Sequence, residues 1–301
     1  MSSFPCCVAD ARCQRCCARF EWTNLTLFDL THSVAPQRIS ALHLAILRSA
    51  LVAYYFAVLV VQWQAWDSRD VDDGYKYFTN WTFLLLFVVM ATICAISWTR
   101  LPCLSKSVEP RVPQTCVAVV FVAWQTLFTA AVFLTIVYWV LLAPFDETRE
   151  SFLNHMVHGG QVAVAGVDFL LNRISFVPAH MSILYLYVAI YMLFAWFWYA
   201  GRTEWIYDFV DFTKEPGTVA LTYIGIAALY TAVFFVIWFA DWLKRKIFKF
   251  SLNDAGRVVE WRGMCLHDVT DDVTVLEMSS GAVKSTTASA REIDDESFDS
   301  A

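Results

Sequence analysis

The sequence predicts an all-α, polytopic membrane protein with six transmembrane helices and a disordered acidic C-terminal tail. Three observations support this prediction. Hydrophobic residues make up 58% of the 301 residues and charged residues only 17%, whereas about a quarter of a soluble globular chain is charged. Six apolar stretches are each long enough to cross a bilayer. After the last of them the chain becomes rich in Ser, Thr, Asp and Glu, a composition typical of disordered segments.

The composition also excludes some classes of function. Aromatic residues make up 16% of the chain, which rules out disorder for most of it because disordered chains are poor in aromatics. The net charge is −6 and no basic domain stands out, so we expect no nucleic-acid partner. The expected partners are membrane lipids.

A spanning helix needs about 20 mostly apolar residues, and the chain divides into three regions on that basis. We expect a Cys-rich N-terminal segment at 1–40, a six-helix transmembrane domain at 41–249 and a disordered tail at 250–301. Residues 1–20 lack the apolar core of a signal peptide, so the first span is expected to begin insertion. The predicted spans are 41–63, 78–98, 117–142, 152–171, 181–200 and 219–241.

The loop charges predict the orientation of the six spans. With the N-terminus inside, sixteen of the 22 Lys and Arg residues fall in inner segments and five in outer loops. Positively charged loops stay on the cytoplasmic side, so both termini are predicted to be cytoplasmic. The sequence distinguishes neither plasma membrane from endomembrane nor one oligomeric state from another.

Five of the nine cysteines lie in the first seventeen residues. A cytoplasmic location argues against disulfides, and the cluster precedes the first span, which favours reversible S-acylation. Unmodified thiols are the next interpretation and a metal site the last, because no second pair matches the Cys13-x-x-Cys16 spacing. The candidate S-acylation sites are Cys6, Cys7, Cys13, Cys16 and Cys17.

A basic cluster follows the sixth predicted span directly. Such a cluster usually acts as a stop-transfer collar and attracts anionic lipid of the inner leaflet. Its members are Lys244, Arg245, Lys246 and Lys249.

The fourth predicted span carries an unusual number of polar residues. Six positions recur at spacings of three and four, which places them on one stripe of a regular α-helix; Phe169 is among the apolar residues expected on the opposite faces. Ionisable side chains in a span usually face the bundle interior or a cavity. The stripe is therefore either a hydrogen-bonded helix–helix seam or part of a functional site. Its members are Asn154, His158, Gln161, Ala165, Asp168 and Asn172.

A hydroxyl and an imidazole are predicted to lie at the same depth. Thr79 lies near the outer start of the second span and His158 near the outer start of the fourth, and both spans run from outside to inside. Histidine is the usual base that activates a hydroxyl nucleophile at neutral pH, so the pair has the residue types for acyl transfer. Asp168 lies ten residues further in, about 15 Å along the axis, and cannot complete a triad. Asn154 and His155 are candidates to orient His158.

Three stretches of the chain resemble a known family. They are Tyr77–Trp81 (Tyr-Phe-Thr-Asn-Trp), Leu153–His158 (Leu-Asn-His-Met-Val-His) and the Gly201-x-x-x-Trp205-Ile206-Tyr207 segment. Over roughly residues 40–250 the chain resembles the Rolling stone-like and androgen-induced (FAR-17a-type) integral membrane proteins, and Tyr-Phe-Thr-Asn-Trp points more to the Rolling stone branch. The six-span layout agrees with this resemblance.

The resemblance implies a catalytic site. Characterised androgen-induced members are threonine hydrolases of fatty acid esters of hydroxy fatty acids; their nucleophile matches Thr79 and their histidine matches His158, while His155 is shared in pattern without a catalytic role. The substrate would be a lipid ester, with neither a metal nor a cofactor required. Asn80 or a backbone N–H is a candidate to hold the oxyanion. The chain departs from the hydrolases at Gly159 and Gly160, where they tend to place Thr.

Two other functions stay open at this point. Acidic outer loops, an acylatable N-terminus and a disordered tail also fit a non-enzymatic membrane adaptor or interaction protein of the Rolling stone type. A transporter could use the polar stripe of the fourth span, with Arg48 pairing with Asp168, although the spans lack the Gly/Pro breaks typical of transporters.

Overall fold

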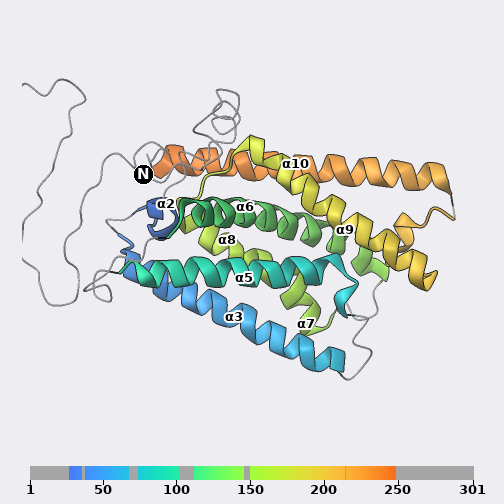
Figure 1. Cartoon of the computed structure of the whole chain (residues 1–301), viewed down its shortest axis with the longest axis horizontal. Coiled ribbons are helices and arrows are strands. Elements are labelled where there is room, and N and C mark those ends of the chain that lie inside the picture. The colour runs from blue at the N-terminus through green and yellow to red at the C-terminus, as the bar shows by residue number, and fades with distance from the viewer. Residues whose placement is uncertain are drawn as a thin grey trace, which may run out of the picture.

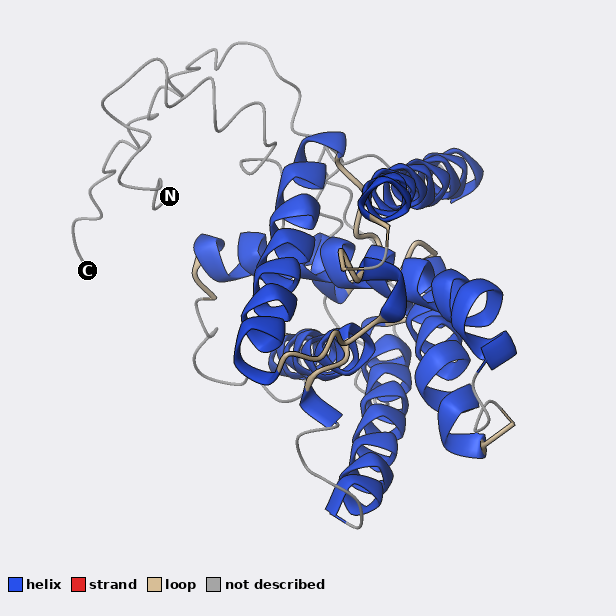
Figure 2. Cartoon of the chain, turned by 90° about the vertical axis from the view of Figure 1, so that its right-hand side faces the viewer, coloured by secondary structure: helices blue, strands red, loops and turns tan. Residues whose placement is uncertain are grey.

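The computed structural model describes residues 27–35, 38–67, 74–101, 112–145, 150–213 and 215–248. In this part of the chain every regular element is a helix, and the only β-type pairing is an isolated bridge between Ser33 and Asn172. Long helices run alongside one another in a bundle (Figures 1 and 2). The N-terminal Cys cluster, Lys249 and the predicted tail lie outside the described residues.

The helices begin and end close to where hydropathy predicts. The principal ones are α3 (Ala41–Asp67), α5 (Phe78–Thr99), α6 (Gln114–Val137), α9 (Met181–Arg202) and α10 (Pro216–Phe248). Short helices flank them: α2 (Leu27–Thr31) before the bundle, η3 (Ala143–Phe145) after the third predicted span, and η5 (Pro178–His180) and η6 (Asp208–Val210) on either side of α9.

Five helical stretches are long and apolar enough to cross a membrane. They are Ala41–Gln64, Phe78–Thr99, Thr115–Leu142, Pro178–Arg202 and Pro216–Phe248, with mean hydropathy between 1.7 and 2.1. Large apolar side chains point outward from them, among them Phe56, Phe197 and Val236 at 59%, 76% and 68% exposure. A soluble monomer rarely exposes so much contiguous apolar surface, whereas hydrocarbon accommodates it, so the helices suit an integral membrane protein.

The fourth predicted span is a helix interrupted by a wider turn. It consists of α7 (Phe152–His155), the π-helical turn η4 (Met156–Gly160) and α8 (Gln161–Leu171). The bounds match the predicted 152–171, but the segment is not among the five long apolar helices, and the six-span count stays a prediction. A matching π-helical turn, η2 (Tyr138–Leu142), extends α6.

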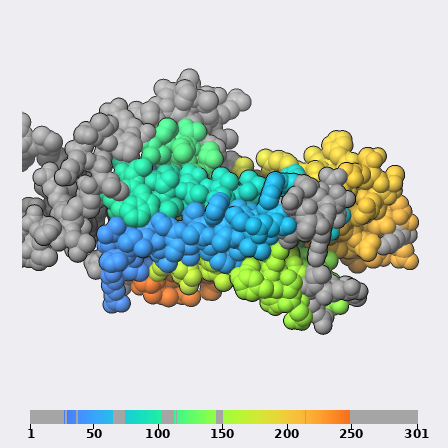
Figure 3. Space-filling model, turned by 90° about the horizontal axis from the view of Figure 1, so that it is seen from below, coloured from blue at the N-terminus to red at the C-terminus, as the bar shows by residue number. Residues whose placement is uncertain are grey.

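Successive long helices alternate in direction, so α5 and the α7–α8 segment run the same way (Figure 1). The first described helix, α2, and the last part of α10 lie at the same end of the bundle (Figure 1). The apolar stretch of α6 is 83% buried, against 17–50% for the other four, so α6 is the central helix. On the face seen in Figure 3, α3 and α5 lie side by side with the 150–160 segment next to the later part of α3.

Phe169, expected on a face opposite the polar stripe, is also buried: it is 7% exposed and stacks on Phe128 with ring centroids 5.2 Å apart. The expectation for Lys244 is wrong. This residue is not part of an exposed collar, because α10 continues to Phe248 and buries it to 5% exposure. Of the cluster's described members, only Lys246 is exposed.

Candidate functional site

Thr79 occupies the first turn of α5 and is 7% exposed. The helix begins without a side-chain cap at Tyr77, and the Phe78 N–H donates instead to the hydroxyl of Tyr207, 3.2 Å away. The hydroxyls of Thr92 and Thr129 bond the carbonyl one turn back, as threonines in membrane helices usually do. Thr79 Oγ1 forms no hydrogen bond with any described residue, His158 included, so its hydroxyl is not committed to the backbone.

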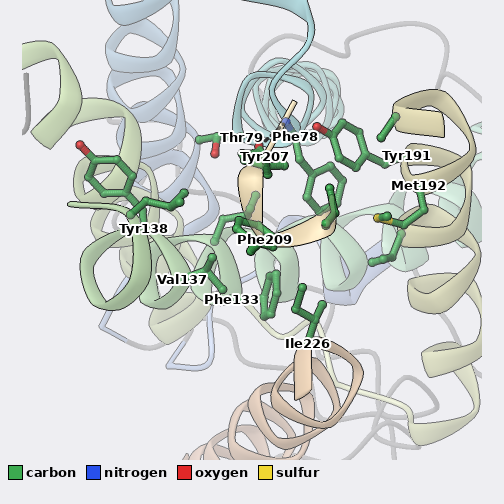
Figure 4. Close-up of a pocket in the computed structure, with 15 residues that line it drawn as sticks. Phe78, Thr79, Phe133, Val137, Tyr138, Tyr191, Met192, Tyr207, Phe209 and Ile226 are labelled. Atoms are coloured by element: carbon green, nitrogen blue, oxygen red, sulfur yellow. Dashed lines mark hydrogen bonds between the residues drawn. The ribbon is translucent and has the colours of Figure 1, made fainter. Parts of the chain in front are cut away.

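Thr79 lines an apolar cavity of about 60 Å³. The side chains around it come from α5, α6, η2, α9, α10 and the segment after α9. Figure 4 shows Thr79 and Tyr138 toward one side, Tyr207 and Phe209 in the middle, and Tyr191 and Met192 on the far side. The polar groups in this lining are the Thr79 hydroxyl and the hydroxyls of three tyrosines, Tyr138, Tyr191 and Tyr207. Burial raises the pKa of Tyr207 to about 12, so this phenol is neutral at physiological pH.

His158 lies in the π-helical turn η4 and is half-buried. Its imidazole lies flat on the ring of Tyr138, with centroids 3.6 Å apart and planes 3° from parallel. Tyr138 lines the cavity that contains Thr79, and α5 contacts η4. Tyr138 therefore lines the same cavity as Thr79 and also contacts the imidazole of His158.

Neighbouring side chains donate hydrogen bonds to backbone carbonyls of η4 and of the first residue of α8. The Tyr54 hydroxyl donates to Met156 O at 3.0 Å, and the Tyr55 hydroxyl donates to Gln161 O at 2.9 Å. Thr135 Oγ1 donates to His158 O. A Cβ atom on Gly160 would come 2.0 Å from the Tyr54 hydroxyl oxygen, so a glycine here allows this close approach. π-Helical turns of this kind occur frequently at functional sites.

Three supporting residues were predicted from the sequence, and the structure shows the surroundings of each. Asn80 is not among the residues lining the Thr79 cavity; its Nδ2 donates to Gly74 O at 2.6 Å and its Oδ1 accepts from Gln62. His155 Nδ1 lies 2.9 Å from Ser151 O, and its ring faces Trp139. Asn154 is half-buried one turn before His158.

Asn80 instead faces a second, larger apolar cavity of about 580 Å³. Leu59 and Trp63 of α3, Leu84 and Leu85 of α5, and Phe194 of α9 contribute to its lining, together with Tyr75 and Trp81. The first turn of α5 thus has one cavity beside Thr79 and another beside Asn80.

The C-terminal part of the polar stripe belongs to an ion-pair network. Arg48 and Asp168, both 0% exposed, pair with 2.8 Å between Nε and Oδ1, so the pairing that depth permits is formed. Asn172 Nδ2 donates to the other Asp168 oxygen at 2.8 Å, and Lys244 Nζ donates to the carbonyls of Phe169 and Asn172. Asp241 lies 3.2 Å from Lys244 and 3.1 Å from Arg245.

The stripe is regular only in α8. Gln161, Ala165 and Asp168 are fully buried there, as the spacing predicts. In η4, which precedes α8, the turn contains an extra residue. Val157 is therefore the buried position there, and His158 does not lie in line with the buried residues of the polar stripe. The Gln161 amide forms no hydrogen bond with the described residues, so a hydrogen-bonded seam accounts for Asn172 but not for Gln161.

Sequence reasoning missed Tyr138, Tyr207, Thr135 and Tyr54 as neighbours of the site. Of these four residues, Tyr207 had a signal in the sequence, because it ends one of the three stretches that carry the family resemblance. No group of three or more His, Cys, Asp or Glu side chains within the described ranges is placed to hold a metal ion.

Comparisons with family models, curated proteins and solved structures find no match to this chain.

Proposed function

We propose that this chain is an integral membrane protein that hydrolyses a lipid ester, with Thr79 as the nucleophile and His158 as the base. The observation that carries the proposal is the position of Tyr138, which lines the Thr79 cavity and stacks on the His158 imidazole. A hydroxyl without a backbone hydrogen bond and a histidine in contact with the lining of its cavity are the two groups that acyl transfer needs.

The resemblance to FAR-17a-type hydrolases supports the same residues from a different direction. Two of the three similar stretches contribute to one cavity, through Phe78 and Thr79 in the first and Tyr207 in the last. The remaining stretch ends at His158, whose ring partner lines that cavity. Segments far apart in the sequence therefore gather where the chemistry is proposed.

The reaction follows from these positions. Thr79 Oγ1 attacks the ester carbonyl carbon while His158 accepts the hydroxyl proton; the ester C–O bond then breaks and the imidazolium gives its proton to the leaving alcohol. Water attacks the acyl-threonine with His158 again as base, which releases the fatty acid and restores the hydroxyl. We assign the oxyanion to the Thr79 N–H, because the N–H groups of Phe78, Asn80 and Trp81 in the same turn already have partners.

The cavities support a lipid substrate. A cavity of about 60 Å³ holds little more than the reacting group, whereas the 580 Å³ cavity has the size and apolar lining of a ligand site. An acyl chain in the larger cavity would meet the first turn of α5, where Thr79 begins the reaction.

Hydrolysis by the purified protein in nanodiscs tests the proposal. The substrate is a fatty acid ester of a hydroxy fatty acid, and a fluorophosphonate probe reports labelling of Thr79. Thr79→Ala and His158→Gln should each lower kcat at least about 100-fold, and Thr79→Ala should abolish labelling. Thr79→Ser retains a hydroxyl and should retain measurable activity.

Two variants on the same helices are matched controls. Thr92→Ala removes a threonine of α5 that bonds Val88 O, and His155→Gln removes the histidine three residues before His158; both should leave kcat within about twofold. A Thr79→Ala protein as active as the wild type would contradict the assignment. A wild type without activity, whose Thr79→Ala variant also keeps its cellular function, would favour an adaptor.

A further inference from the structure

The ring contact between Tyr138 and His158 has the geometry of a specific orienting contact. The planes are 3° from parallel and the centroids 3.6 Å apart, closer than any other stacked ring pair in the described residues, where centroids lie 4.1 Å or more apart. Offset or edge-on arrangements at 4.5–7 Å are the usual geometry of neighbouring aromatic rings. A contact this close and this parallel restricts rotation of the imidazole about the Cα–Cβ and Cβ–Cγ bonds of His158.

The local fold explains why Tyr138 reaches His158. Tyr138 is the first residue of η2, is 5% exposed, and packs edge-on against Trp139 at 5.1 Å. His158 is in the middle of η4. Thr135, one turn before Tyr138 on α6, donates its hydroxyl to the His158 carbonyl. The end of α6 is thus joined to the backbone of η4 by Thr135, and η2 contacts η4 through the stacked rings of Tyr138 and His158.

Different contacts hold the backbone and the imidazole ring of His158. Thr135 and Tyr54 hold the backbone of η4 through the carbonyls of His158 and Met156, but neither contact fixes the direction of the imidazole. The His158 Nδ1 atom is buried, so the ring has one nitrogen inside the protein in the conformation that the stack holds. The stack with Tyr138 is a contact on the imidazole ring itself.

We propose that Tyr138 is a positioning residue that fixes the plane of the His158 imidazole beside the cavity containing the Thr79 hydroxyl. This inference rests on the proposed hydrolase function and assigns the site a residue that touches the base rather than the ester. The face of the phenol ring also attracts a cation. It therefore stabilises the imidazolium during the interval between uptake of the Thr79 proton and its transfer to the leaving alcohol.

The variants are chosen to separate the ring from its hydroxyl. Tyr138→Phe retains the stacked ring and removes only the hydroxyl, whereas Tyr138→Leu removes the ring. Trp139→Leu is the control, because Trp139 lies next in the same π-helical turn and its ring faces His155 at 5.1 Å. Tyr138→Met is a second substitution of similar length in case the leucine variant does not fold.

The first measurement does not require activity. In protein carrying labelled histidine, the His158 ring resonance, identified by its loss in His158→Gln, should be shifted upfield by the Tyr138 ring current. Tyr138→Phe and Trp139→Leu should keep the shift, and Tyr138→Leu or Tyr138→Met should remove it. A wild-type His158 resonance at the position of an unstacked histidine would overturn the proposal without any variant.

The second measurement is the division between kcat and KM. Tyr138→Leu should lower kcat about 10- to 100-fold with KM nearly unchanged, since a misplaced base slows the chemical step, and Tyr138→Phe should restore kcat to within about threefold of wild type. A lost ring-current shift with unchanged kcat would overturn the positioning role and leave the hydrolase assignment intact. An inactive wild type with the shift present would overturn the hydrolase assignment and this role with it.

Discussion

Arg48 and Asp168 lie 120 residues apart in the sequence and meet in the interior with 2.8 Å between Nε and Oδ1, both fully buried. The guanidinium also donates to Leu30 O and, at 2.8 Å, to Ser97 Oγ. One side chain therefore links α3 to α2, α5 and α8.

Removal of one partner from this pair should cost far more than removal of both. Asp168→Ala leaves a buried guanidinium without its carboxylate, and we expect a loss of about 3–5 kcal/mol of unfolding free energy. The double variant Arg48→Met/Asp168→Leu should be more stable than either single variant, because no uncompensated charge remains. Unfolding in mixed detergent micelles measures these differences. Additive losses in the double variant would show that the pair does not act as a unit.

The two adjacent glycines of η4 should respond differently to alanine. Gly160→Ala places a Cβ 2.0 Å from the Tyr54 hydroxyl and should cost about 1–3 kcal/mol. Gly159→Ala meets only Trp139 Nε1 at 3.9 Å and should be neutral or stabilising by up to about 1 kcal/mol. Thermal unfolding of both variants provides the comparison, and equal stabilities would refute the close contact.

Tyr54→Phe combined with Gly160→Ala gives a direct check of the cause. Tyr54→Phe removes the hydroxyl that the added Cβ would meet, so the double variant should recover part of the stability lost in Gly160→Ala. It should not recover all of it, because the hydrogen bond to Met156 O is lost as well.

Asp241 should be essential for the irregular segment that follows α8. Its Oδ2 accepts the Phe176 N–H at 3.0 Å, and the carboxylate lies between Lys244 and Arg245. Asp241→Ala should destabilise by about 3–5 kcal/mol because a buried amide and a buried ammonium lose their partner. Lys246→Ala, on the exposed side of the same turn, should change stability by less than about 0.5 kcal/mol. Comparable losses in the two variants would contradict this role.

Tyr207 should make the protein sensitive to alkaline pH. Its pKa is raised to about 12 by burial, whereas an unfolded tyrosine ionises near pH 10. Stability from this group is therefore complete below about pH 10 and is lost as the pH rises toward 12, since the unfolded chain releases the proton first. Tyr207→Phe should weaken this alkaline loss relative to wild type in unfolding curves taken from pH 9 to 12. An identical pH profile in the variant would exclude the contribution.

The positions of the long apolar helices could be predicted because hydropathy indicates them, although α10 is longer than the predicted 219–241. Predicted and observed starts coincide at Ala41, Phe78, Phe152 and Met181. The burial of Gln161, Ala165 and Asp168 was likewise predictable, because α8 follows the regular period. The Arg48–Asp168 pair could be anticipated from depth and opposite charge.

The π-helical turn η4 could not be predicted, because the side chains that contact it are distant in the sequence. Its carbonyls at Met156 and His158 accept hydrogen bonds from Tyr54 and Thr135, and no local pattern around His158 indicates this. For the same reason Tyr138, twenty residues earlier, could not be identified as the ring partner of His158.

The buried position of the Lys244 side chain could not be predicted from the sequence either. A lysine just after an apolar stretch normally extends to the headgroups. Here Nζ turns inward to Phe169 O and Asn172 O, a destination created by the irregular backbone after α8. The charge pattern of α10 alone does not distinguish a lysine that extends to the headgroups from one that turns inward.

The distribution of charge along the bundle has a mechanical consequence. At the end where α2 lies and α10 ends, buried guanidinium, ammonium and carboxylate groups link the helices, and separating the helices there would leave buried charges unpaired. The cavity that Thr79 lines is surrounded mainly by aromatic and aliphatic side chains. We therefore expect a guest larger than this cavity of about 60 Å³ to be accommodated by displacement of the helices around Thr79.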